Sequence, residues 1–268
     1  MSTIDRQKKT IAFGVNSYTV KYQLQNDRTL LMDRTVHQPA AAVQIDVFGL
    51  CWAFSTATIP PGMVWFERHG NLIPVVGNIA VFVPPFSVMK WHLSPGPFRY
   101  ESIFFAVEPP PFLPKEPVIF AVEDTRCPTT LAQVLAMIGR AEHLIPIGKE
   151  EVPCSIARKT RTMIEQTYAE DVSFAEIAQR LNLSHAVMTR NFRRCYGLPP
   201  VVFRNKIRVM DAQRLMLVNQ LPVAMAAEAV GFADLRQFNR AFKKESNTTP
   251  SHFCTPGAAA GRPRALTD

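Results

Sequence analysis

Cationic side chains recur along one short segment of the chain, VGFADLRQFNRAFKKESNTTPSHF at residues 230–253. Arg236 and Arg240 lie four residues apart, and Phe238 and Phe242 repeat at the same interval in a different phase. Because residues four apart share one face of a helix, the phenylalanines predict a buried stripe and the cations an exposed ridge. Guanidinium groups bind phosphate oxygens and the edge of guanine, so this segment favours recognition of a polyanion.

The first half of the chain offers few residues for metal binding or catalysis. Its MKWH segment supplies one histidine, His92, with Glu67 and His69 some distance upstream. An open metal site needs several imidazole and carboxylate ligands, and this set is incomplete. The sequence also lacks the GxSxG and phosphate-loop patterns and any pair of carboxylates at a recognisable spacing. We therefore expect no catalytic residue, no metal, no cofactor and no enzymatic activity.

Cysteine usage and hydropathy suggest a reduced, cytoplasmic protein. The five cysteines lie far apart and never form a CxxC pair, which argues against a disulfide framework and a zinc knuckle. The longest apolar run, VFGLCWAF at residues 47–54, is far shorter than the roughly 20 residues of a membrane helix. The first ten residues lack the core of a signal peptide. We expect buried, reduced thiols and no membrane partner.

The net charge of +8 is confined to one part of the chain. Residues 1–155 hold 13 Lys and Arg and 13 Asp and Glu, whereas residues 156–268 hold 17 and 9. A basic half beside a neutral half indicates that one part binds a polyanion while the other does something else. The length of 268 residues and the hydrophobic content of 47% suffice for two domains, each with its own core.

The two parts also differ in hydrophobic period. Between about residues 12 and 120, short apolar runs such as AAAVQIDVF, NIAVFVPP and YESIFFAV are separated by turn residues, which predicts the strands of a barrel or sandwich. An amphipathic helix is predicted next, from apolar residues at helical spacing: Leu131, Val134, Leu135 and Ile138. We expect the following domains: 1–126 as a β domain, 127–153 as helix and linker, 154–254 as a helical domain, and 255–268 as a disordered tail.

Residues 174–196 predict two helices joined by a tight turn. Ser173 and Glu176 have the spacing of a capping box at the start of the first helix. Ala178 is small enough for two helices to cross closely, and Asn182 tolerates the left-handed conformation that the turn needs.

Residues 223–245 repeat this arrangement, with Ala227 at the small position and Gly231 in the turn. Leu235, Phe238 and Phe242 are expected to be buried in its second helix. Between the two units, residues 199–220 predict a helix of about 20 residues, about 30 Å long. That length is close to the roughly 34 Å repeat of B-DNA, so the helix would hold two units in successive major grooves.

Two segments, AEIAQRLNLSHAVMTRNFRRCYGLPPVVF and VAMAAEAVGFADLRQFNRAFKKESNTTPSHF, resemble the DNA-binding domain of the AraC/XylS family of bacterial transcription regulators. The motifs GF, FxRxFKK and TPxxF coincide at the family spacing over about residues 155–254, although Asn191 stands where an apolar residue is usual. The resemblance implies an α+β multidomain fold: an N-terminal cupin-like β-barrel followed by an amphipathic helix, and a C-terminal all-α domain with two helix-turn-helix motifs joined by a long helix. It also implies binding to double-stranded promoter DNA, activation through RNA polymerase, and a homodimer formed through the helix after the barrel.

The family pattern assigns base-facing positions to residues of both units: His185, Ala186, Thr189, Arg190, Asp234, Arg236, Gln237 and Arg240. Arg236 and Gln237 are the strongest specificity candidates, since arginine pairs with guanine and glutamine with adenine through two hydrogen bonds. Phosphate is the open alternative for Arg190 and Arg240, which lie near the inner edges of their helices. Phosphate contacts are also expected from six further cations: Arg193, Arg194, Arg204, Lys206, Lys243 and Lys244.

A small effector would suit a pocket with aromatic walls and a few polar groups, and the expected lining residues are Trp65, Arg68, His69, Trp91 and His92. The apolar stripe of residues 131–138 is either a dimer seam or a cover for the barrel, and the resemblance favours the seam. Two alternatives stay open: a constitutive DNA-binding regulator whose first half serves for assembly, and a cupin-type enzyme.

Overall fold

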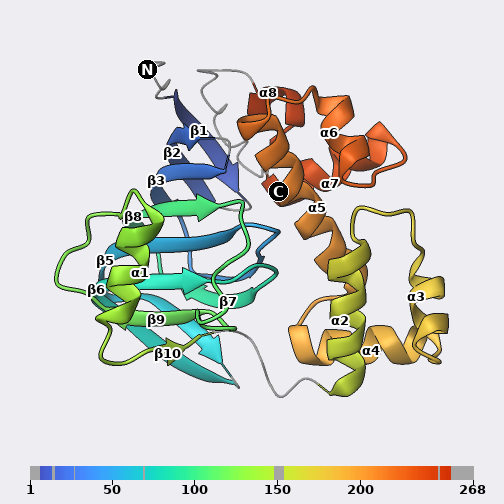
Figure 1. Cartoon of the computed structure of the whole chain (residues 1–268), viewed down its shortest axis with the longest axis horizontal. Coiled ribbons are helices and arrows are strands. Elements are labelled where there is room, and N and C mark those ends of the chain that lie inside the picture. Colours follow the sequence, from blue (N-terminus) through green and yellow to red (C-terminus); the bar gives the residue numbers. More distant parts are fainter. Residues whose placement is uncertain are drawn as a thin grey trace.

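A computed structural model describes residues 7–13, 16–26, 28–68, 70–147, 154–246 and 248–254. Figure 1 shows an N-terminal sheet region packed beside a C-terminal helical region, which confirms the predicted α+β organisation. The predicted disordered tail at residues 255–268, most of the predicted linker, and His69 lie outside the described residues. Within the described part of the chain, no helix has the length and hydropathy to cross a membrane.

In the described residues up to position 147, ten antiparallel strands build the sheet region. They are β1 (Gln7–Phe13), β2 (Asn16–Asn26), β3 (Thr29–Gln38), β4 (Ala42–Val47), β5 (Trp52–Arg68), β6 (Asn71–Val83), β7 (Val88–Leu93), β8 (Gly96–Phe105), β9 (Val118–Ala121) and β10 (Ile145–Pro146). The main path runs β1-β2-β3-β8-β5-β6-β9-β10, and β7 pairs with both β4 and β5. Strand β7 follows the two prolines after β6, and it pairs with β4 and β5.

Strand β5 changes partner along its length and thereby curves the sheet. Its first half pairs with β8 from Trp52 to Ala57, and its second half pairs with β7 from Val64 to Phe66. The register with β6 shifts between Ile59 and Val64, where two prolines and a glycine interrupt regular pairing. Such an irregularity bends and twists a strand. Side chains from β3 through β8 consequently line one common cavity.

The predicted amphipathic helix is α1 (Leu131–Gly139), and it covers the sheet. Thr130 and Gln133 form a capping box at its start. Val134 is fully buried, and the rest of the predicted stripe packs against the same core: Leu131, Leu135 and Ile138. This packing fits the alternative of a cover for the barrel, and the dimer seam stays a prediction because Leu131, Leu135 and Ile138 are only partly buried.

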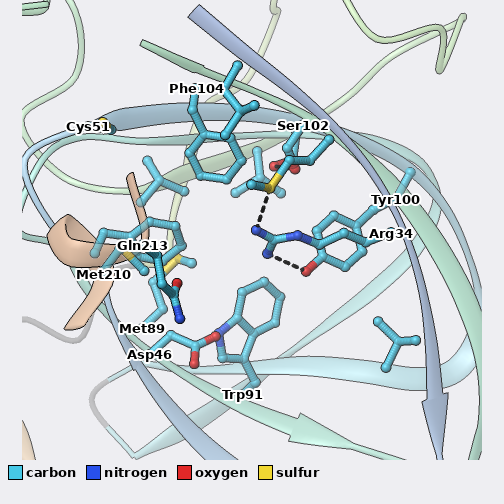
Figure 2. A pocket seen from close by; sticks show the side chains of 18 of the residues that line it. Arg34, Asp46, Cys51, Met89, Trp91, Tyr100, Ser102, Phe104, Met210 and Gln213 are labelled. Carbon is cyan, nitrogen blue, oxygen red and sulfur yellow. Dashed lines mark hydrogen bonds between the residues drawn. The ribbon is translucent and has the colours of Figure 1, made fainter. Parts of the chain in front are cut away.

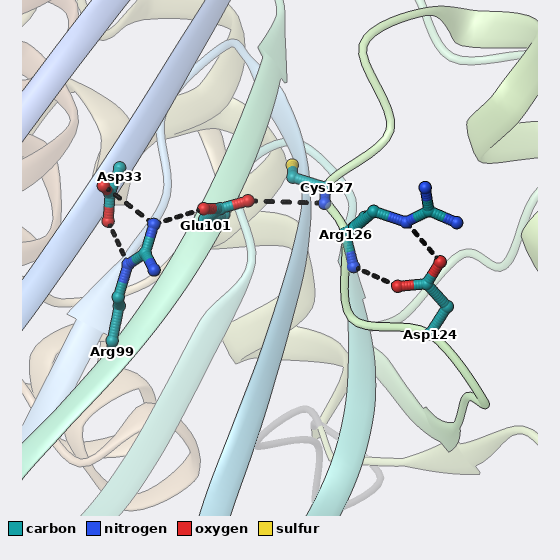
Figure 3. A network of polar contacts seen from close by, with 6 residues as sticks. All are labelled: Asp33, Arg99, Glu101, Asp124, Arg126 and Cys127. Carbon is teal, nitrogen blue, oxygen red and sulfur yellow. Dashed lines mark hydrogen bonds and ion pairs between the residues drawn. The ribbon is translucent and has the colours of Figure 1, made fainter.

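Figure 3 shows how polar contacts fix the outer side of the sheet and the segment before α1. Arg99 of β8 binds Asp33 of β3 with two nitrogens, at 2.8 and 3.0 Å, and also contacts Glu101. The other oxygen of Glu101 accepts a hydrogen bond from the backbone N–H of Cys127 at 3.4 Å. The network thus joins two strands to the connection that leads into α1.

Seven helices form the helical region over the described residues from 154 to 254. They are α2 (Ser155–Thr167), α3 (Phe174–Arg180), α4 (His185–Tyr196), α5 (Pro200–Val218), α6 (Val223–Ala229), α7 (Leu235–Ser246) and α8 (Pro250–Cys254). One core gathers around α2 to α5 and a second around α5 to α8, so α5 contributes to both. The predicted long helix is confirmed as α5 with 19 residues.

The sheet and helical regions contact one another along α2 and α5. Val36 of β3 is 1% exposed and belongs to the core that contains α6, α7 and α8. The backbone N–H of Gly49 faces the sulfur of Met210 in α5 at 3.0 Å. Arg161 of α2 donates to the carbonyl of Phe86, in the turn between β6 and β7, at 3.1 Å. The long helix is therefore in contact with both halves of the chain.

Candidate nucleic-acid interface

The first helix-turn-helix unit is formed by α3 and α4. Both hydrogen bonds of the predicted capping box are present, and the bond from the Ser173 backbone N–H lowers the pKa of Glu176. Asn182 has a φ of 55°, the left-handed turn that the sequence predicted. Ala178 is 2% exposed, and its carbonyl accepts the N–H of Leu183 at 2.9 Å. A larger side chain at this position would separate the two helices.

Helix α4 buries one face and exposes another. Met188 and Phe192 are 0% exposed, so they hold the helix against α2, α3 and α5. The opposite face forms one shallow, open hollow whose lining is His185, Ala186, Thr189, Arg190, Arg193 and Arg194. These are all the residues of α4 that the sequence assigned to DNA, and the fold brings them together on one surface.

The second unit is formed by α6 and α7 around Gly231. This residue has a φ of +87°, and a Cβ added here would lie 2.4 Å from the backbone oxygen of Ala169. Ala226 and Ala227 are 0% and 3% exposed and allow the close crossing of α6. Only glycine can adopt this positive φ without strain and also avoid a clash between a side chain and Ala169.

Helix α7 is anchored by Phe238 and Phe242, both 0% exposed, as the sequence predicted. Leu235 is 45% exposed, so its predicted burial is wrong: it occupies the first turn, where α7 projects beyond the core. Asp234 accepts the backbone N–H of Arg236 at 2.9 Å, which stabilises the start of the helix. The outer face is exposed and carries Arg236, Gln237, Arg240, Lys243 and Lys244.

Two of the residues predicted to contact phosphate lie on α5 and make contacts within the protein. Arg204 lies over the ring of Phe174, 4.1 Å from its centroid, and donates to the carbonyl of Val172. Lys206 forms an ion pair with Glu245 at 2.6 Å. Both side chains are engaged within the protein because α5 is packed on several sides, which the sequence pattern did not reveal.

Other polar residues of α5 are structural, and sequence reasoning missed them. Arg208 is 5% exposed and donates to the carbonyls of Tyr168 and Glu170, and burial lowers its pKa to about 10. The hydroxyl of Tyr168 donates to Asp211 at 2.9 Å, and burial is the main reason that its pKa is raised. These contacts join α2 to α5 and so stabilise α5, the rod between the two helix-turn-helix units.

The curved sheet encloses a cavity of about 230 Å³, which α5 borders on one side. Of the four predicted pocket residues that the structure describes, only Trp91 lines it. His92 instead binds Glu67 at 2.7 Å and Arg68 binds Glu116 at 3.0 Å, while Trp65 is not part of the lining. Neighbouring residues of a strand point to opposite faces, so Trp91 and His92 cannot both point inward.

Polar groups that the sequence did not single out lie among the apolar walls of this cavity. Figure 2 shows Arg34, Asp46 and Trp91 facing the same space, with Met210 and Gln213 of α5 at one side. Arg34 donates to the hydroxyl of Tyr100 at 3.2 Å and lies 5.5 Å from the ring centroid of Phe104. Among the described residues, the buried indole N–H of Trp91 has no hydrogen-bond partner. Burial raises the pKa of Asp46.

Comparisons with known proteins agree with this geometry. Residues 177–255 match a family model described as a helix-turn-helix domain. The Msm operon regulatory protein of Streptococcus mutans is 26% identical over 143 residues, covering 49% of this chain and 51% of that protein. The HTH-type transcriptional activator RhaS of Escherichia coli is 29% identical over 87 residues, covering 32% of this chain and 31% of the activator. The chain therefore matches about half or less of the length of these relatives.

A solved structure of ToxT from Vibrio cholerae O395 aligns over 85% of this chain and 98% of its own, with a TM-score of 0.54 and 11% identity. This likeness shows a shared fold of sheet region and helical region. The fold and the exposed helices α4 and α7 define a two-domain protein with a double helix-turn-helix DNA-binding domain. Residues 177–255 therefore carry a helix-turn-helix domain similar to those of transcription regulators, which agrees with the resemblance of the sequence motifs to the AraC/XylS family.

Proposed function

We propose that the protein regulates transcription by placing α4 and α7 in successive major grooves of promoter DNA. The observation that carries this proposal is a pair of exposed cationic helices joined by the 19-residue helix α5. At 1.5 Å per residue the rod is about 28 Å long, close to the roughly 34 Å repeat of B-DNA. The rod is braced by buried contacts of Arg208 and Asp211, which favours a fixed spacing of the two helices.

In this proposal the exposed residues divide into two groups. Base edges are read by His185, Ala186, Thr189, Arg190, Asp234, Arg236, Gln237 and Arg240, and phosphates are bound by Arg193, Arg194, Lys243 and Lys244. The activator RhaS is among the relatives, so we propose activation through RNA polymerase as the direction of control. A homodimer through the partly buried stripe on α1 is retained as a proposal.

We also propose that the cavity binds an effector with an apolar body and one carboxylate. Structures of ToxT are described as bound to a methylnaphthalenyl butenoic acid and to an unsaturated fatty acid. The cavity of this chain offers the guanidinium of Arg34 and the N–H of Trp91 to such a carboxylate. Its apolar walls, which include Phe66, Phe98 and Phe104, suit the body of the ligand.

Selection of binding sites from a random duplex library tests the DNA proposal. We expect enriched sequences with two conserved blocks about 10 base pairs apart, one block for each helix. Arg236→Ala should degrade only the block read by α7, and Arg190→Ala only the other. Enrichment of a single block, or of no sequence at all, contradicts the proposed geometry. If no carboxylic acid tested changes the response of the promoter, the alternative of a constitutive DNA-binding regulator is favoured.

A further inference from the structure

The helical region holds a second chemically distinct site: we propose that Cys154 and Cys195 are a peroxide-reactive thiol pair that closes into an intrachain disulfide. The two cysteines are 41 positions apart in the sequence, yet their sulfur atoms are 3.9 Å apart. Cys154 immediately precedes α2, and Cys195 lies in the last turn of α4. Both contact the core shared by these two helices.

Cys154 has the surroundings of a reactive thiol. It is partly exposed, and it occupies the N-terminus of α2, where partial positive charge favours an anion. Its sulfur lies 3.6 Å from Oδ1 of Asn191, and the same oxygen accepts a hydrogen bond from Arg194 at 3.0 Å. Burial opposes ionisation, but the backbone N–H of Ala157, the Cys195 thiol and the charge of Arg194 outweigh it and lower the pKa of Cys154.

The other described cysteines lack these features. Burial raises the pKa of Cys51 to about 11 and that of Cys127 to about 12, so both remain thiols at neutral pH. Cys195 is 4% exposed, and burial raises its pKa as well. Because the thiolate is the nucleophile, oxidation should begin at Cys154, and Cys195 is placed to react second.

The chemistry requires a hydroperoxide as oxidant. The Cys154 thiolate attacks hydrogen peroxide: an S–O bond forms, the O–O bond breaks, and hydroxide leaves and takes up a proton. The sulfur of Cys195 then attacks the sulfenic sulfur of Cys154, so that an S–S bond forms and the hydroxyl leaves with the thiol proton as water. Two thiols and one peroxide thus give one disulfide and two water molecules.

The closing step needs only a local movement. The sulfurs must approach from 3.9 Å to about 2.05 Å. Cys154 is the N-cap of α2: its carbonyl accepts the N–H of Arg158 at 3.2 Å, while its ψ of 143° lies outside the helical region. The product would tie the start of the helical region to the helix that carries the proposed first recognition surface. This site is separate from the sheet cavity and does not depend on the proposed effector.

Titration of the full-length protein with hydrogen peroxide tests the proposal, in a Cys254→Ser background so that four thiols remain. We expect two thiols to be lost, the mass to fall by about 2 Da, and a peptide map to join residues 154 and 195. Dithiothreitol should reverse all three changes. The reaction should slow as pH is lowered, because thiolate is lost.

Three variants separate this outcome from general oxidation. Cys154→Ser should reduce the rate of thiol loss at least 10-fold, whereas Cys51→Ser should leave it unchanged. Cys195→Ser should leave a sulfenic acid on Cys154 that dimedone traps, which the parent protein should not show. A disulfide to Cys51 or Cys127, or equal reaction of all four thiols, overturns the proposal. If Cys195→Ser fails to fold, the peptide map of the parent decides alone.

Discussion

At the scale of the residue, one side-chain type has different roles in this protein according to its depth. Arg208 is buried, and its guanidinium satisfies two backbone carbonyls, whereas Arg236 is exposed on α7. Arg204, between these extremes in exposure, stacks on Phe174. Charge alone therefore does not identify a DNA contact, and the surroundings of each guanidinium decide.

Substitutions on α7 should separate base reading from phosphate binding. Arg236→Ala should weaken binding to the selected sequence by about 1–3 kcal/mol and reduce discrimination at one or two base pairs. Lys244→Ala should weaken binding to selected and scrambled duplexes alike. It should also reduce the slope of the logarithm of the binding constant against the logarithm of salt concentration by about one. Titrations of both duplexes at two salt concentrations measure these effects. Equal losses on the two duplexes for Arg236→Ala would reject its role in specificity.

Asp46 should make stability depend on pH. Burial raises its pKa in the folded state, while Gln44, Lys206 and Arg34 act in the opposite direction. The folded state therefore favours the protonated carboxyl, and stability should be lost as pH rises above about 4, the unfolded value, through the folded pKa. Asp46→Asn should remove this loss and raise the free energy of unfolding at pH 7 relative to that at pH 4.

Urea unfolding of wild type and Asp46→Asn between pH 4 and pH 8 measures the difference. The Glu176→Gln variant supplies a control of opposite sign, because the Ser173 backbone lowers the pKa of Glu176 and its contribution is lost as pH falls. A difference between wild type and Asp46→Asn that does not vary with pH would contradict the assignment.

At the scale of the element, the turns set the crossing of the helices in each unit. Asn182 and Gly231 both adopt positive φ, but their surroundings differ. Asn182 is exposed, whereas Gly231 lies against the backbone of Ala169 and the guanidinium of Arg208. The second unit is therefore joined to the start of the helical region at this glycine.

Gly231→Ala should destabilise the protein by more than about 1 kcal/mol, because it combines an unfavourable φ with a contact to backbone that cannot move easily. Gly139→Ala is the matched control: it lies at the end of α1, and a Cβ there meets no atom within 4 Å. That change should be neutral or stabilising by up to about 1 kcal/mol. Thermal unfolding of the two variants compares them, and equal effects would refute the close packing at Gly231.

At the scale of the whole molecule, α5 belongs to the DNA-binding domain and also borders the sheet cavity. Met210 and Gln213 line the cavity, and Gly49 of the sheet region contacts Met210. An effector in the cavity would therefore touch the rod that spaces α4 and α7. If the ligand contacts α5 differently in two states of the protein, the cavity is coupled to the DNA-binding helices.

A carboxylic acid with an apolar body should raise the melting temperature, and its methyl ester should not. Arg34→Met should weaken binding of the acid about 10- to 100-fold, since a hydrogen bond to a charged group contributes about 1.5–3 kcal/mol. Arg99→Met, on the outer side of the sheet, should bind as the wild type does. Equal binding of acid and ester by the wild type would contradict a carboxylate site at Arg34.

Local signals in the sequence determined the two helix-turn-helix units. These signals are the capping box of Ser173, the turns at Asn182 and Gly231, and the apolar spacing of Phe238 and Phe242. Each acts within a few residues, so each can be predicted from the sequence. The strands and α1 were predicted for the same reason, whereas the pairing of β7 was not.

Tertiary structure alone decided which polar residues meet. It placed Arg34 and Asp46 of separate strands around one cavity, turned Arg204 and Lys206 of α5 toward partners inside the protein, and brought the sulfurs of two cysteines together. These outcomes depend on the register of strands and the crossing of helices over tens of residues. Packing of the whole chain fixes those distances, and no local pattern encodes them.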